Sequence, residues 1–178
     1  MAESISLKRL RKWIILAAGK YKLDPYLIAA FCKVESNYNT WAMKYEDHYR
    51  WLVDSPDPVS IEYHGQRTSW GLMQIMGAVA RERGFKERYF SQICEASIGI
   101  DLGCRHLVWL RDKKGYKGDD MIAAYNAGSP RMIRMSGGQE QYKTPYVNQH
   151  YVDKIKDAQY RLIQTQIFSP NVGSISVA

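Results

Sequence analysis

The chain has 178 residues, of which 46% are hydrophobic and 24% charged, and this describes a globular protein with one buried core. No stretch approaches the ~20 consecutive apolar residues that would cross a bilayer, so we expect no transmembrane segment and no membrane insertion. A short signal peptide at residues 14–19 is the alternative to a helix there, but the apolar run is brief and belongs to an amphipathic pattern, so we expect no signal peptide.

The net charge of +7 favours an acidic polymer as partner without identifying it. Nucleic acid, an anionic membrane and the bacterial wall all qualify. The basic residues are scattered and form no nucleic-acid motif, so nucleic-acid binding rests on charge alone and is not expected.

Three cysteines, Cys32, Cys94 and Cys104, show no Cys-x-x-Cys spacing. Their odd number argues against a disulfide framework or a zinc site and favours thiols buried as small hydrophobes. A Cys94–Cys104 bond is the alternative, although both residues are expected on or beside one helix. We expect no metal and no cofactor.

The first segment, about residues 6–20, places apolar residues at helical spacing and predicts an amphipathic helix. A second helix follows Asp24, which can cap it, and Pro25, which suits its first turn. Residues 41–67 are rich in aromatic and charged residues, with two prolines, and predict an extended excursion. Helical periodicity then returns over residues 70–83, 95–114, 119–126 and 144–166.

The second helix carries the most informative residue. Helical spacing stacks Leu27, Ile28, Phe31 and Glu35 on one face, so Glu35 points where the apolar side chains point. Desolvation disfavours a charged carboxylate, raises its pKa and makes it a candidate general acid. The alternative is a glutamate that rotates into water at a frayed helix end.

Four short motifs accompany these helices: Glu35-Ser36, Gly71-Leu72-Met73-Gln74-Ile75, Ala124-Tyr125-Asn126-Ala127-Gly128 and Tyr151-Val152. Together and in this order they resemble the catalytic domain of soluble lytic transglycosylases, enzymes that cleave peptidoglycan. The resemblance implies a mainly α, single lysozyme-like helical domain with a substrate groove. It divides the chain into an N-terminal helix at 1–22, a catalytic domain at 23–167 with an insertion at about 44–68, and a flexible tail at 168–178.

The resemblance implies roles residue by residue. Glu35 matches the catalytic acid and base, and Tyr125 the tyrosine whose hydroxyl sits beside it and would orient it. The matched substrate-binding residues are Ser36, Met73, Gln74, Asn126 and Tyr151. Each of these could instead be an ordinary core or helix residue.

The implied reaction breaks the β-1,4 bond between N-acetylmuramic acid and N-acetylglucosamine in peptidoglycan strands. The substrate's own C6 hydroxyl replaces the second carboxylate of ordinary glycosidases and gives a 1,6-anhydro end. Glu46 and Asp47 lie in the insertion, where Glu46 is the candidate second carboxylate of a goose-type-like muramidase. The alternative is that both are solvated or pair with Arg50. A non-catalytic wall-binding module is a further alternative.

The insertion also resembles that of phage-encoded members, which share Trp41-Ala42 and Tyr45-Glu46. This favours a virion-associated protein, or one released from the host cytoplasm, that acts on the cell wall beside other virion or envelope components. The chain departs from the family at Thr40, Lys44, Met76-Gly77 and the stretch before Tyr151, which puts the sugar subsites in doubt more than the reaction.

Overall fold

The computed structural model describes residues 6–131 and 146–169. Its helices are α1 (Leu7–Tyr21), α2 (Pro25–Ser36), α3 (Ile61–Gln66), α4 (Gly77–Glu82), the 3₁₀ helix η1 (Phe90–Cys94), α5 (Ala96–Asp112), α6 (Gly118–Ala127) and α7 (Gln149–Gln164). Its strands are β1 (Met43–Tyr45), β2 (Thr68–Trp70) and β3 (Ile75–Met76). The expectation of a mainly α protein is therefore confirmed.

Helix α2 begins and ends as its sequence predicts. The Asp24 side chain accepts a hydrogen bond from the Tyr26 backbone amide at 2.9 Å, and Pro25 occupies the first turn. Asn37 ends the helix in the left-handed conformation, with φ of 51°. Ile28 and Phe31 are fully buried, which fixes the face that α2 turns toward the core.

The helix predicted over residues 70–83 is wrong in its first half. Strands β1, β2 and β3 form a small antiparallel sheet in that order, with Met43 opposite Trp70 and Trp70 opposite Ile75. Gly71 and Gln74 adopt positive φ, 68° and 44°, which breaks the helix and turns the chain between β2 and β3. Only α4 is helical in this stretch.

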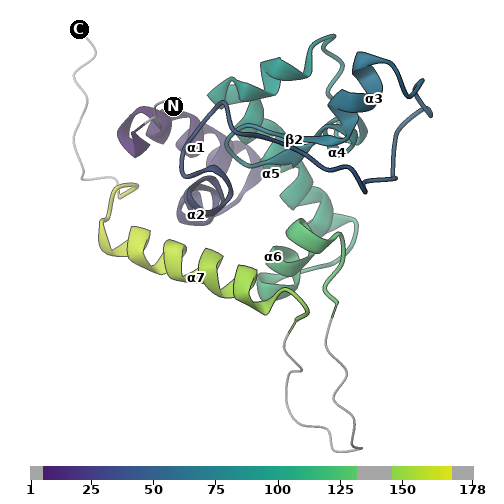
Figure 1. Ribbon diagram of the computed structural model, residues 1–178. Helices are drawn as coiled ribbons and strands as arrows, with labels where there is room; N and C mark the ends of the chain where they lie inside the picture. Colours follow the sequence, from purple (N-terminus) through teal and green to yellow (C-terminus); the bar gives the residue numbers. More distant parts are fainter. Residues whose placement is uncertain (1–5, 132–145, 170–178) are drawn as a thin grey trace, which may run out of the picture.

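Helices α2 and α7 pack against each other, and α6 contacts both α5 and α7. Figure 1 shows α7 as the long yellow-green helix beside α2 and α6, with the strands and α3 in the other half of the molecule. The main core lies between α1, α2, α5, α6 and α7, and a smaller cluster beside the sheet contains Ile75, Phe85 and Phe90.

The expectation of buried thiols is confirmed, because all three cysteines are free and buried. Residues 144–145 of the last predicted helix and 170–178 of the predicted tail lie outside the described residues. Among the helices that the structure describes, none is long and apolar enough to cross a membrane.

Candidate active site

Glu35 lies in the last turn of α2, on the side of the helix that also carries Phe31. Its side chain is half-buried. Burial raises the pKa of its carboxyl to about 7, against a hydrogen bond from Tyr151 that lowers this pKa. A carboxyl that holds its proton near neutrality can act as an acid, and after losing that proton as a base.

Tyr151 completes the surroundings of this carboxyl from α7. Its hydroxyl donates a hydrogen bond to Glu35 Oε1. Burial and the nearby charge of Glu35 raise the pKa of Tyr151 well above its usual value, so the hydroxyl stays protonated and remains a donor. The family resemblance assigns Tyr151 to substrate binding; in the structure its hydroxyl contacts the candidate acid.

Tyr125 of α6 takes a different partner from the one expected. Its hydroxyl donates to the Met73 carbonyl oxygen at 2.8 Å, so its single hydrogen is not directed to Glu35. Its ring packs on Phe31 with centroids 4.6 Å apart. Burial and the charge of Glu35 raise the pKa of the Tyr125 hydroxyl, which places this neutral hydroxyl near the carboxyl. In this structure the hydrogen bond to Glu35 comes from Tyr151 and not from Tyr125, and the role of Tyr125 beside the carboxyl stays a prediction.

Ser36 and Gln74 brace the turn between β2 and β3. The Ser36 hydroxyl lies 2.9 Å from the Leu72 carbonyl oxygen and 3.0 Å from the carbonyl oxygen one helical turn earlier in α2. Gln74 Nε2 donates to the carbonyl oxygens of Ala42 and Gly71, both at 2.9 Å. These contacts tie the end of α2 and the start of the sheet to one turn. The Ser36 hydroxyl is used within the protein, and the amide oxygen of Gln74 takes no hydrogen bond from the described part of the chain.

Met73 is a core residue. Its side chain is 0% exposed, and a β-carbon on Gly103 of α5 would lie 2.4 Å from its sulfur atom. The structure directs this side chain inward against α5, and saccharide contact by Met73 stays a prediction that this position does not support. Its carbonyl oxygen instead receives the Tyr125 hydroxyl.

Asn126, at the end of α6, is exposed. Its Oδ1 accepts a hydrogen bond from Asn148 Nδ2 at 3.0 Å, and the same nitrogen donates to the Ala123 carbonyl oxygen. Asn148 thereby fastens the start of α7 to the end of α6. Within residues 6–131 and 146–169, the amide nitrogen of Asn126 makes no hydrogen bond, and its contact with a substrate stays a prediction.

The candidate second carboxylate forms a surface ion pair. Glu46 Oε1 lies 2.8 Å from Lys44 Nζ, and Asp47 lies 3.5 Å from His48. The Asp47 side chain is 74% exposed. The contact to Arg50 that the sequence suggested is replaced by these two pairs.

His106 of α5 lies beside the site, but none of the sequence motifs includes it. It is buried, with its ring 5.3 Å from that of Tyr125 and stacked on Trp109. Burial and the charge of Arg83 lower the pKa of His106 to about 3, so a neutral imidazole supports Tyr125. His106 is four residues from Leu102 and four from Leu110, so helical spacing could have predicted that it lies on the buried face of α5.

The described residues contain no cluster of three or more histidine, cysteine or acidic side chains suited to a metal ion. The chemistry of this site is that of a partly buried carboxyl, two neutral tyrosine hydroxyls and backbone carbonyl groups.

The family to which these features belong is shown by sequence comparison. The family model described as Transglycosylase SLT domain matches residues 12–148, and the chain belongs to this family. Two similar relatives are proteins named membrane-bound lytic murein transglycosylase C, from Histophilus somni strains 2336 and 129Pt. Each is 24% identical over 162 residues that cover 84% of this chain, and the match spans 38% of the relative's own length.

Proposed function

We propose that this protein is a peptidoglycan lytic transglycosylase. It would cleave the β-1,4 bond between N-acetylmuramic acid and N-acetylglucosamine and leave a 1,6-anhydro end. The observation that carries the proposal is Glu35, whose half-buried carboxyl has its pKa raised to about 7 by burial and takes a hydrogen bond from Tyr151. Membership of the transglycosylase family supports the same reaction class.

In the first step, protonated Glu35 gives its proton to the glycosidic oxygen. Because Oε1 is occupied by the Tyr151 hydroxyl, Oε2 is the oxygen that delivers the proton. The bond between C1 of the muramic sugar and the bridging oxygen breaks, and the leaving sugar departs with a new hydroxyl. Glu35 is left as a carboxylate, whose charge the Tyr151 hydroxyl stabilises.

In the second step, the C6 hydroxyl of the same muramic sugar attacks C1, and Glu35 takes its proton. A C1–O6 bond forms, the acid is regenerated and no water is consumed. Intramolecular attack of this kind can reach effective molarities of ~10⁵ M or more, which removes the need for a second carboxylate.

The first experiment tests Glu35. Glu35→Gln should fold and bind purified peptidoglycan but release soluble fragments roughly 10²–10⁴-fold more slowly, because both steps use the carboxyl. Glu95→Gln, at the start of α5, is the matched control. Near wild-type release by Glu35→Gln would refute the assignment, and binding without release by the wild type would identify a wall-binding module.

A muramidase on the same fold is the competing reaction, with water activated by a second carboxylate. The ion pairs of Glu46 and Asp47 at the surface disfavour it. Digestion in ¹⁸O-enriched water separates the two reactions, because hydrolysis labels the new muramic end and the proposed reaction does not. If the main product has labelled reducing ends, and Glu46→Gln no longer forms that product, the protein is a muramidase and not a transglycosylase.

We further propose a phage context, in which the protein is associated with a virion and reaches the wall during infection or lysis. The support is the resemblance of Trp41-Ala42 and Tyr45-Glu46 to phage-encoded members. Mass spectrometry of purified virions tests this proposal, and absence of the protein from particles that degrade the wall would count against it.

A further inference from the structure

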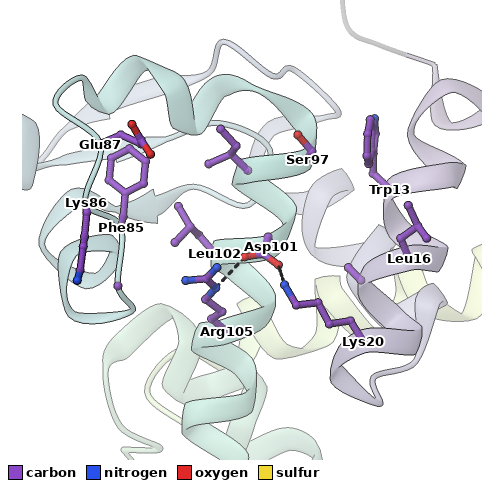
Figure 2. A pocket seen from close by; sticks show the side chains of 13 residues that line it. Trp13, Leu16, Lys20, Phe85, Lys86, Glu87, Ser97, Asp101, Leu102 and Arg105 are labelled. Carbon is purple, nitrogen blue, oxygen red and sulfur yellow. Dashed lines mark hydrogen bonds and ion pairs between the residues drawn. The ribbon is translucent and has the colours of Figure 1, made fainter.

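A cavity of about 620 Å³ lies across the outer side of α5, and none of its lining residues belongs to the Glu35 site. Figure 2 shows Trp13 and Leu16 of α1 on one wall, with Phe85 and Lys86 of the segment after α4 on the opposite wall. The outer face of α5 forms the floor between them. We call this cavity the α5 groove. Its volume falls within the roughly 300–1,000 Å³ of sites that bind small ligands.

The floor of the α5 groove holds one carboxylate against two cations. Asp101 lies 2.6 Å from Lys20 Nζ and 2.7 Å from Arg105 Nε, as the dashed lines in Figure 2 mark. The Tyr21 hydroxyl donates a further hydrogen bond to Asp101 at 2.6 Å. Asp101 is thus engaged by two cations at once. The opposite wall adds the cation of Lys86 and the carboxylate of Glu87, so the lining carries three cations against two carboxylates, an excess of one positive charge.

Arg105 is held in place before any ligand arrives. Its Nε also lies 3.2 Å from the Tyr21 hydroxyl, and its Nη1 donates to the Arg83 carbonyl oxygen at 3.1 Å. Among the described residues, these contacts leave Nη2 without a partner. A guanidinium fixed in this way loses little conformational entropy when it binds a carboxylate.

Apolar side chains make up much of the rest of the lining, which also contains Ser97. Trp13 is 37% exposed and Leu16 is 55% exposed, and they lie one helical turn apart on α1. Ile98 and Leu102 continue this apolar surface on α5. Exposed apolar side chains gathered around a charged centre are typical of a binding site rather than of an ordinary solvated surface.

We propose that the α5 groove binds the stem peptide of peptidoglycan, a short acidic peptide with small apolar side chains. Its carboxylates would meet Arg105, Lys20 and Lys86, and its methyl groups would pack on Trp13 and Leu16. A neutral sugar would not compensate the excess positive charge of the groove lining. The identity of the ligand rests on the proposed function, since the groove itself defines only an acidic, partly apolar peptide.

A second binding site for peptidoglycan would change how the protein binds its substrate. Glycan strands carry many stem peptides, so binding at the α5 groove would keep the Glu35 site close to further cleavable bonds. Two weak contacts to one polymer give an avidity well above that of either contact alone.

The test titrates the full chain with the tripeptide L-Ala-γ-D-Glu-meso-diaminopimelate, which has no glycosidic bond, and follows the backbone and indole amide signals by NMR. We expect shifts at Trp13, Asp101 and Arg105 and weaker binding as salt is added. Leu16→Asp puts a negative charge at the groove edge and should weaken binding at least about fivefold. Ile15→Asp makes the same change at a neighbouring exposed position outside the groove lining and should bind like the wild type.

Absence of shifts at the groove, equal weakening by Leu16→Asp and Ile15→Asp, or shifts from the peptide-free disaccharide instead of the tripeptide would each overturn the proposal. Circular dichroism confirms that both variants fold. The cleavage assay tests the proposed function separately. Glu35→Gln should abolish cleavage but leave the tripeptide titration unchanged, because the tripeptide has no glycosidic bond to cleave.

Discussion

Replacing Glu35 by glutamine should make the protein more stable at alkaline pH and nearly unchanged at acid pH. The reason is the desolvation that raises the pKa of this carboxyl from 4.5 to about 7. At pH 4.5 the folded state holds nearly all of this proton and the unfolded state about half of it, and at lower pH both states hold it, so the contribution of Glu35 to stability is largely intact there. As the pH rises through 7, the folded state must bury a charge that the unfolded chain leaves in water, and this contribution is lost.

The size of the effect follows from the shift. Each unit of pKa difference is worth about 1.4 kcal/mol, so a change from 4.5 to about 7 amounts to about 3 kcal/mol at most above pH 8. Because the carboxyl is only half-buried, solvent screening makes this a ceiling. Glutamine stays neutral at every pH and avoids the loss. For a chain of this length, this ceiling corresponds to roughly 6–12 °C in Tm.

The assay is thermal unfolding of the wild type and Glu35→Gln at pH 4.5 and pH 8.5. Glu46→Gln is the matched control, because Glu46 forms a surface ion pair with Lys44 and such pairs contribute little. Equal Tm differences between Glu35→Gln and the wild type at the two pH values would mean that the carboxyl is solvated. The argument for a buried acid would then fail.

Other residues of the site give three further predictions. Tyr151→Phe removes the hydrogen bond that lowers the pKa of Glu35, so the alkaline fall in kcat/KM should move to higher pH. The same change should lower kcat about 10–100-fold. A pH profile that does not move would contradict the contact between Tyr151 and Glu35. Tyr125→Phe leaves the Met73 carbonyl oxygen without its partner and should lower the free energy of unfolding by about 1–3 kcal/mol. It should not move the pH profile of kcat/KM. Urea denaturation and pH–rate measurements check these two expectations. Gly103→Ala places a β-carbon 2.4 Å from the Met73 sulfur and should cost about 1–3 kcal/mol in the same denaturation assay; wild-type stability would show that Met73 moves aside freely.

Helical spacing predicted the position of Glu35 because the signal is local. Asp24, Pro25 and the apolar residues that follow determine the start and the buried face of α2, and Glu35 shares that face. Periodicity failed where the strands are too short to show a repeated alternation of apolar and polar residues: β2 has three residues and β3 has two. The sequence also did not predict the positive φ of Gln74, whose side chain donates to the carbonyl oxygen of Ala42, 32 residues earlier in the chain.

The partners of the site residues depend on tertiary packing. The motifs named Tyr125 and Tyr151, but nothing local to either shows which hydroxyl reaches Glu35 and which reaches the Met73 carbonyl oxygen. The direction of the Met73 side chain is set by the gap beside Gly103 of α5, a residue that no motif includes.

The hydrogen bond between Tyr151 and Glu35 joins residues that are 116 positions apart in the chain. During synthesis, the helix that carries the acid leaves the ribosome long before the helix that carries the hydroxyl. An unfinished chain that stops before α7 therefore lacks the Tyr151 hydroxyl that bonds to Glu35. We expect such a nascent or truncated product to degrade the wall no faster than Tyr151→Phe, so the activity proposed for Glu35 would reach its full rate only when the last helix has docked.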